Sequence, residues 1–264
     1  WGARVLGISA LLGAALLVGL LGIVLEVVLL RRIYAAPELF QLLATFGVVL
    51  IVQDAVQLIW GPEDLLGPRA PGLAGFVTLA GQRFPTYELM LVAAGPVVLG
   101  LLLLLFHRTR FGILVRAATG DREMVAALGV EQRRLFTSVL FLGAFLAGLA
   151  GALQLPREAA NTLMDVSIIV EAFVVTVIGG MGSLGGAFLA AVIVGELQAF
   201  GIVVLPRITL VLVFLVMAVV LVVRPHGLLG RPEPVGAGRV PTTPALALPS
   251  PRVRTVWAVG IALL

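Results

Sequence analysis

The chain contains no cysteine, and its 18 basic residues are all arginine, so lysine is absent as well. Without cysteine, these 264 residues hold no disulfide, no thiolate metal site and no cysteine nucleophile. Without lysine there is no standard phosphate-binding loop, which requires a lysine after its glycines. The sequence therefore predicts a protein that has no ATP site of its own.

Other familiar catalytic and metal-binding patterns are also missing from the sequence. It contains no Ser-His-Asp arrangement, no His-Glu-x-x-His motif and no pair of acids at a catalytic spacing. The two histidines, His107 and His226, lie beside arginines at the ends of apolar runs, which does not indicate a metal site. We therefore expect no enzyme activity, no metal and no cofactor.

Charge is scarce, and apolar residues are abundant. Only 12% of the residues are charged, whereas soluble domains typically carry about 25%. Hydrophobic residues make up 60% of the chain, and the mean hydropathy is +1.14. This composition predicts an all-α fold, a polytopic bundle of membrane-spanning helices that each need roughly 20 apolar residues.

Seven apolar runs are candidates for these spans. The first is too long for a signal peptide, and Arg31-Arg32 follows it without a small-residue cleavage site. The stretch 166–205 is too long for one helix, so the glycines at 179–186 predict a broken pair of short helices. The predicted spans are Val5–Leu30, Leu39–Trp60, Leu89–Phe106, Leu135–Leu155, Val166–Ile178, Ala187–Leu205 and Ile208–Val223.

The chain is predicted to have three parts. Residues 1–230 form the transmembrane domain, which we expect to be incomplete at its N-terminus because the chain begins at Trp1 rather than at methionine. Residues 231–254 are rich in proline and glycine and predict a cytoplasmic linker. Residues 255–264 resemble the start of a further span that is cut short, which predicts a fragment of a longer protein.

The arginines indicate which loops lie in the cytoplasm. Thirteen of the 18 fall in one set of alternate loops, which includes 107–134, and five fall in the other set. Because cytoplasmic loops carry the excess of positive charge, 107–134 is predicted to be cytoplasmic and the N-terminus external.

Several polar residues and glycines inside the spans are candidates for a substrate path. Polar groups at this depth avoid lipid, so they face either a wet pathway or a partner helix, and the sequence leaves both alternatives open. The run GMGSLG matches the G-x-G-x-x-G pattern, but no βαβ unit surrounds it, so a nucleotide role is rejected. Glu26, one turn before Arg31, is expected to be an interfacial acid. The candidate path residues are Gln53, Asp54, Gln57, Glu171, Gly180, Gly182 and Glu196.

The cytoplasmic segment RAATGDREMVAALGVEQRR (116–134) contains a predicted short helix, Arg122–Leu128. Asp121 is a favourable N-cap, Glu123 suits the positive helix start, and Gly129 is a natural stop. A helix of this length is not stable alone, so it must dock. It could lie on lipid, but its small apolar residues and its acids favour a groove in a partner protein over an anionic bilayer.

The motif Glu123-x-x-Ala126-Ala127-x-Gly129 resembles the coupling loop of bacterial ABC-importer permeases. Together with AFLAGLAGAL (144–153) and the stretches 171–197 and 221–230, it is similar to the high-affinity branched-chain amino-acid permease family. The resemblance covers residues 20–230. In that family we expect Lys at position 171 and Asn at position 54, so Glu171 and Asp54 leave open whether a branched-chain amino acid or a related small amino acid, amide or urea is carried.

The resemblance implies a multi-pass permease of the bacterial inner membrane. It implies as partners two ATP-binding cassette ATPases, a periplasmic substrate-binding protein, and a second copy of the chain or a sister permease, to which the C-terminal end would be fused. The alternative is an ATP-independent secondary transporter or channel. The residues implied in ATPase coupling are Asp121, Arg122, Glu123, Ala126, Ala127, Leu128 and Gly129.

Overall fold

The structure is a computed structural model that describes residues 2–34, 36–67, 75–79, 81–162, 164–204 and 209–230. The described residues all belong to one unit of the chain, residues 1–230. The predicted linker 231–254 and the apolar segment 255–264 lie outside the described residues, so both assignments remain predictions.

Five helices of the described part are long and apolar enough to cross a membrane, judged by length and composition. The first begins as α1 (Gly2–Leu25) and continues through a π-helical turn, η1 (Glu26–Leu30), into α2 (Arg31–Ile33). The other four are α3 (Glu38–Trp60), α4 (Thr86–Arg108), α7 (Gln132–Gln154) and α9 (Leu184–Val204). The predicted all-α membrane bundle is confirmed, and the protein is a multi-pass membrane protein.

Two shorter helices, α8 (Met164–Gly179) and α10 (Thr209–Val223), occupy the remaining predicted spans. With 16 residues, α8 is about 24 Å long, less than the roughly 30 Å of a hydrocarbon core. The predicted break is confirmed, because α8 ends at Gly179 and α9 begins at Leu184. Gly180 and Gly182 have φ of +92° and +79°, a left-handed backbone that ends the helix.

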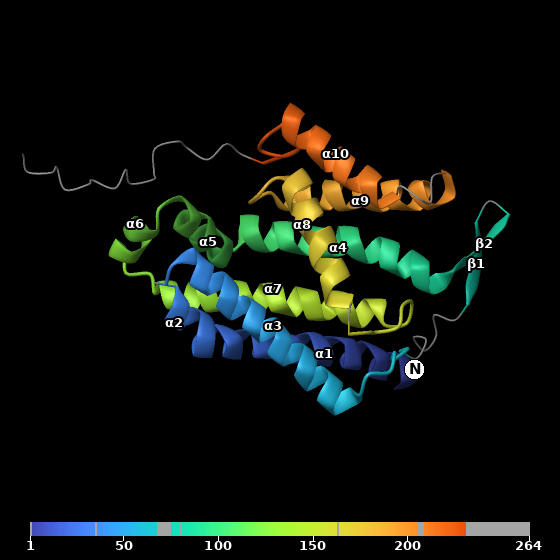
Figure 1. Cartoon of the computed structure of the whole chain (residues 1–264), viewed down its shortest axis with the longest axis horizontal. Coiled ribbons are helices and arrows are strands. Elements are labelled where there is room, and N and C mark those ends of the chain that lie inside the picture. Colours follow the sequence, from blue (N-terminus) through green and yellow to red (C-terminus); the bar gives the residue numbers. More distant parts are fainter. Residues whose placement is uncertain are drawn as a thin grey trace, which may run out of the picture. The chain divides into compact units, whose positions relative to one another are not determined.

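The bundle has two ends, which Figure 1 separates clearly. Helices α5 (Arg110–Gly120) and α6 (Arg122–Ala127) lie at one, called here the inner end. The antiparallel hairpin of β1 (Phe76–Leu79) and β2 (Gln82–Pro85) lies at the other, called here the outer end. This hairpin was not predicted from the sequence.

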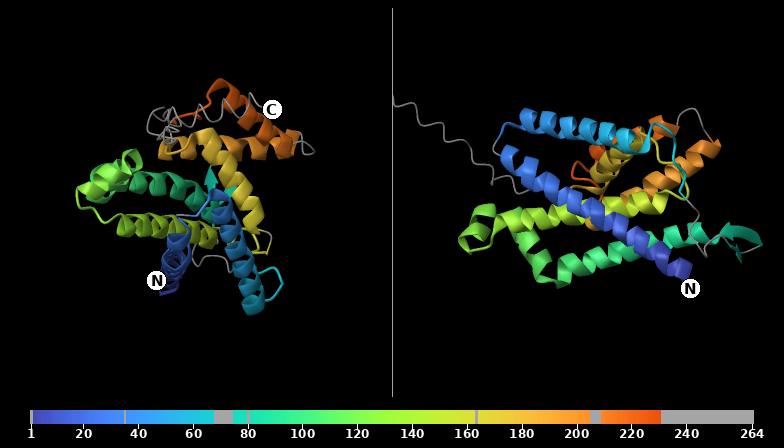
Figure 2. Two further views of the ribbon diagram at one scale, coloured as in Figure 1. Left: turned by 60° about the vertical axis from the view of Figure 1, so that its left-hand side comes forward. Right: turned by 90° about the horizontal axis from the view of Figure 1, so that it is seen from below.

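Helices α1 and α7 lie side by side and make the most extensive contact between any two helices of the described part (Figure 2). Small residues permit this close approach. A Cβ added at Gly148 would lie 2.7 Å from Cβ of Val18, and one at Gly22 would lie 2.6 Å from Cβ of Ala144. Such small residues let the backbones of membrane helices approach one another, which ties α7 to α1.

A second packed unit joins α8, α9 and α10 through the buried residues Val174, Ile178, Ala190, Val194 and Val213. The turn after α10 closes the inner end of α8. The backbone N–H of Leu228 donates to the carbonyl of Ile178 at 2.8 Å, and that of Leu229 donates to Gly179 at 3.2 Å. These bonds satisfy carbonyls that the end of α8 would leave unpaired.

Glu26 is buried within the protein, with only 1% of its surface exposed, and its interfacial position in a membrane stays a prediction. Its carboxylate accepts hydrogen bonds from Nη2 of Arg31 at 3.1 Å and from the hydroxyl of Thr137 on α7 at 2.7 Å. In an α-helix, residues five apart point about 140° away from one another. The π turn aligns Glu26 with Arg31, and α7 covers them both.

Glu26→Ala is expected to destabilise the protein by about 2 kcal/mol, because it leaves the partly buried Arg31 without its counter-charge. Thr137→Val removes one hydrogen bond to the same carboxylate and is expected to cost about 1 kcal/mol. Thermal unfolding of the detergent-purified protein measures both. Equal unfolding temperatures for Glu26→Ala and the wild type would show that the buried pair does not hold α1 to α7.

Candidate functional site

Helix α6 has the ends that its sequence predicts. The side chain of Asp121 caps the helix by accepting a hydrogen bond from the backbone N–H of Met124 at 2.9 Å. Gly129 follows the helix with φ of +80°, and its N–H donates to the carbonyl of Ala126 at 2.9 Å. The predicted N-cap and stop are confirmed, while Leu128 is the C-cap and not the last helical residue.

Helix α6 docks inside its own chain. Val125, which is 5% exposed, packs with Ala118 of α5 and Leu135 of α7 in a small apolar cluster. This contact explains how so short a helix is stable, since isolated helices of this length are not. Because α6 is fixed to both neighbours, a force on α6 acts directly on the start of α7.

Apart from Val125, the apolar residues of α6 and its C-cap are uncovered. Met124 is 61% exposed and Leu128 is 76% exposed, and their spacing of four places them on one side of the helix. Ala126 and Ala127 are also exposed. The side chains of Arg122 and Glu123 lie outside the described residues. We call Met124, Ala127 and Leu128 the α6 knob; its shape suits a groove in another molecule.

Of the three polar candidates on α3, one is hydrogen-bonded to another helix and two are exposed. Nε2 of Gln53 donates to Oδ2 of Asp165, at the start of α8, at 2.6 Å. Asp54 and Gln57 are exposed on the surface of the bundle. Gln53 therefore ties the outer end of α3 to the outer end of α8, and Asp54 and Gln57 are left for water or a partner chain.

The acids of α8 and α9 lie on the exposed surface of this chain. Glu171 of α8 accepts a hydrogen bond from Nε2 of Gln198 on α9 at 3.2 Å. Glu196 is also exposed, two residues from Gln198 and hence on a different side of α9. Acids within membrane-spanning helices do not face lipid, so this surface meets water or protein.

The two glycines of the predicted path differ in their surroundings. Gly180 is buried, and a Cβ added there would lie 2.4 Å from the carbonyl oxygen of His226 and 2.5 Å from the nitrogen of Gly230. A Cβ added at Gly182 would meet nothing within 4 Å. Gly180 thus serves close packing at the inner end, nine residues along the chain from Glu171. The structure does not gather the predicted path residues into one cluster but distributes them over α3, α8, the turn after α8 and α9.

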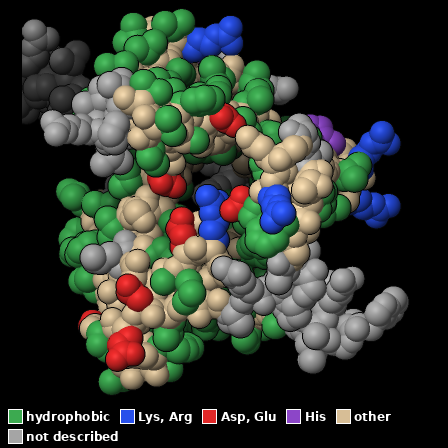
Figure 3. All heavy atoms as spheres, turned by 90° about the vertical axis from the view of Figure 1, so that its right-hand side faces the viewer, with side chains coloured by type: hydrophobic (Ala, Val, Ile, Leu, Met, Phe, Trp, Pro, Cys, Tyr) green, Lys and Arg blue, Asp and Glu red, His purple; other side chains and the backbone are tan. Residues whose placement is uncertain are grey.

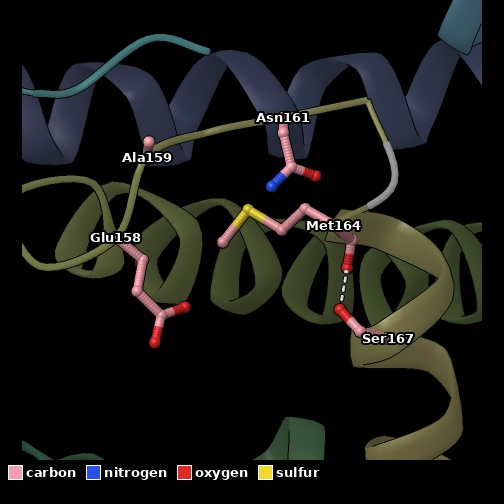
Figure 4. A pocket seen from close by; sticks show the side chains of 5 residues that line it. All are labelled: Glu158, Ala159, Asn161, Met164 and Ser167. Carbon is pink, nitrogen blue, oxygen red and sulfur yellow. Dashed lines mark hydrogen bonds between the residues drawn. The ribbon is translucent and has the colours of Figure 1, made fainter.

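A cavity of about 510 Å³ lies at the outer end of the bundle, beside the start of α8 (Figure 4). Viewed from this end, acidic side chains border a hollow, and a basic side chain lies among them (Figure 3). The residues lining the cavity are Glu158, Ala159, Asn161, Met164 and Ser167.

Two features of these surfaces, helix α5 and the outer cavity, were not predicted from the sequence. Helix α5 was not predicted, although its apolar residues Phe111, Leu114, Val115 and Ala118 recur at helical spacing and Thr109 caps the helix start. The cavity has no comparable signal, because it arises where the loop after α7 meets the start of α8. Within the described residues, no group of three or more His, Cys, Asp or Glu could hold a metal ion.

Comparison with known proteins adds an independent finding. The family model described as "Branched-chain amino acid transport system / permease component" matches residues 3–221. The high-affinity branched-chain amino acid transport system permease protein BraD of Pseudomonas aeruginosa is 27% identical over 231 residues, which cover 86% of this chain and 75% of BraD.

Two further relatives carry related descriptions. The high-affinity branched-chain amino acid transport system permease protein LivH of Escherichia coli is 26% identical over 230 residues, covering 85% of this chain and 75% of LivH. A probable branched-chain amino acid transport permease protein LivH of Methanocaldococcus jannaschii is 33% identical over 126 residues, 46% of this chain and 39% of that protein. No solved structure matches the chain.

Proposed function

The chain belongs to the family of permease components of branched-chain amino acid transport systems, and from this premise we propose that it forms one half of the membrane path of an ATP-driven importer. The substrate is a branched-chain amino acid or a related small amino acid. The chain does not hydrolyse ATP; separate ATPase subunits do so, and they dock on the α6 knob. The observation that carries this proposal is α6 itself, a short helix fixed by Val125 with Met124 and Leu128 left uncovered.

The packing around α6 supports a mechanism for coupling. The chain runs from α6 directly into α7, whose Leu135 shares the apolar cluster of Val125. Two residues further along, Thr137 hydrogen-bonds to the buried Glu26 of η1, and α7 then packs along α1. When the ATPases close on ATP, the displacement of α6 moves α7 and α1 together, and this movement alternates access to the path.

The substrate path runs along the polar surface that α8 shares with α3 and α9. We propose that the acids and amides exposed there face a water-filled route or the partner permease, because they cannot face lipid. Gly180 and Gly182 allow the helix break at the inner mouth of this route. A second copy of the chain or a sister permease covers the other side of this route. A substrate-binding protein delivers substrate at the outer end. The whole assembly lies in the bacterial inner membrane.

The test is reconstitution of the chain with its ATPases, its partner permease and its binding protein in vesicles. Uptake of L-leucine is expected to require ATP and to continue when ion gradients are collapsed. Uptake that follows an ion gradient and ignores ATP would reject the proposal and favour a secondary transporter or a channel.

A further inference from the structure

The hollow at the outer end is open to its surroundings and is lined by polar and apolar side chains. Its volume of about 510 Å³ lies within the roughly 300–1,000 Å³ of typical ligand pockets. Its walls combine the carboxylate of Glu158, the amide of Asn161 and the hydroxyl of Ser167 with the apolar side chain of Met164 (Figure 4). A molecule with one charged end and one apolar end matches this lining.

One side of α8 leads from this cavity into the membrane. Met164, Ser167 and Glu171 are spaced by three and four residues, which places them on the same side of the helix. The hydroxyl of Ser167 donates to the carbonyl of Met164 at 2.9 Å, so its oxygen remains available as an acceptor toward the cavity. Glu171 lies about one helical turn, or about 6 Å, further along α8 from Ser167.

The depth of Glu171 can be counted along two helices. It lies seven residues from Met164, or about 10 Å along the axis of α8. Its partner Gln198 lies six residues, or about 9 Å, before Val204 at the outer end of α9. Because Gln198 lies within α9, a helix long and apolar enough to cross a membrane, the carboxylate that it contacts is expected within the hydrocarbon region.

Glu171 lacks a counter-charge within the described part of the chain. The ion pairs found there join Arg31 to Glu26 and Arg134 to Glu131. The amide of Gln198 orients one carboxylate oxygen of Glu171 but carries no charge. A carboxylate at this depth is costly unless a cation meets it, and such groups in membrane proteins commonly mark substrate pathways.

We propose that Glu171, oriented by Gln198, binds the ammonium group of an amino acid that enters through the outer cavity. The inference rests on the proposed function and assigns a role to one residue of its path. The ammonium group brings three donors and one positive charge to the carboxylate. The ligand class is therefore a small amino acid with a free amino group, and Glu171 is the residue that distinguishes it from the corresponding acid without nitrogen.

The experiment uses the full transporter in vesicles and measures L-leucine uptake, ATP hydrolysis and subunit assembly for Glu171→Gln and Glu171→Asp. Glu171→Gln keeps the shape and removes the charge, so uptake is expected to fall at least about tenfold, while assembly and ATP hydrolysis persist. Glu171→Asp keeps the charge and is expected to retain more uptake than Glu171→Gln. The control is Glu63→Gln, which removes an exposed outer-end acid outside the cavity lining and is expected to transport normally.

Three results would overturn the inference. Wild-type uptake by Glu171→Gln would show that the charge does not meet the substrate. Loss of assembly would show that Glu171 pairs with a basic group of the partner permease. Equal defects in Glu171→Gln and Glu171→Asp would assign it a role in packing. If the wild-type transporter carries no amino acid at all, the proposed function fails together with this inference. A substitution of Glu171 that leaves uptake unchanged rejects only the role of Glu171.

Discussion

The double substitution Met124→Glu, Leu128→Glu is expected to abolish ATP-driven uptake while leaving the chain folded in the membrane. Both side chains are exposed, and neither belongs to the apolar cluster that holds α6 in place. In a partner groove, each would contribute roughly 1.5–3 kcal/mol of burial, and an unpaired carboxylate would add a desolvation cost. A combined loss above about 3 kcal/mol weakens ATPase association more than about 100-fold.

Co-purification of the ATPases measures this loss, and thermal unfolding of the permease shows whether the fold is retained. Phe76→Glu is the matched control, because it places the same acid at an equally exposed apolar residue of the outer hairpin. It is expected to leave association unchanged. Normal ATPase binding and uptake by the double variant would show that the α6 knob is not a docking surface.

Gly180→Ala is expected to prevent stable folding, whereas Gly182→Ala is expected to be mild. Both glycines have positive φ, so either substitution costs about 1 kcal/mol of backbone strain. At Gly180 the new Cβ would also overlap the carbonyl of His226 and the nitrogen of Gly230, both at 2.5 Å or less. Relieving these backbone overlaps is expected to cost about 3 kcal/mol more, because the turn 224–230 must leave α8.

The yield of folded protein and its unfolding temperature in detergent distinguish the two glycines. A much larger decrease is expected for Gly180→Ala, and Gly182→Ala serves as the control for the conformational cost alone. Similar decreases for both variants would show that the turn after α10 does not pack against the end of α8.

The features that could be predicted from sequence are those determined by nearby residues. Asp121 and Gly129 define the ends of α6 through contacts within four residues, so their residue types were sufficient. The apolar runs likewise predict the spans, because each helix satisfies its own backbone hydrogen bonds in a membrane. The break between α8 and α9 follows from Gly180 and Gly182, which both take a positive φ.

The features that could not be predicted depend on residues far apart in the chain. The burial of Glu26 requires Thr137, 111 residues away, and a π turn that has no clear sequence signal. The bond between Gln53 and Asp165 spans 112 residues, so sequence alone could not decide whether Gln53 serves pairing or transport. Helix α5 is the exception, because the spacing of its apolar residues indicates a helix from nearby residues alone.

The most direct test of the account is site-specific crosslinking from the α6 knob. Since the chain has no native cysteine, Leu128→Cys introduces the only thiol, and Arg83→Cys on the outer hairpin provides the control. Within the assembled transporter, Leu128→Cys is expected to crosslink to a cysteine placed in the docking groove of the ATPase, and Arg83→Cys is not. Labelling of Leu128→Cys by an impermeant reagent from outside intact cells, without any crosslink to the ATPase, would contradict the central claim that α6 couples this permease to ATP hydrolysis.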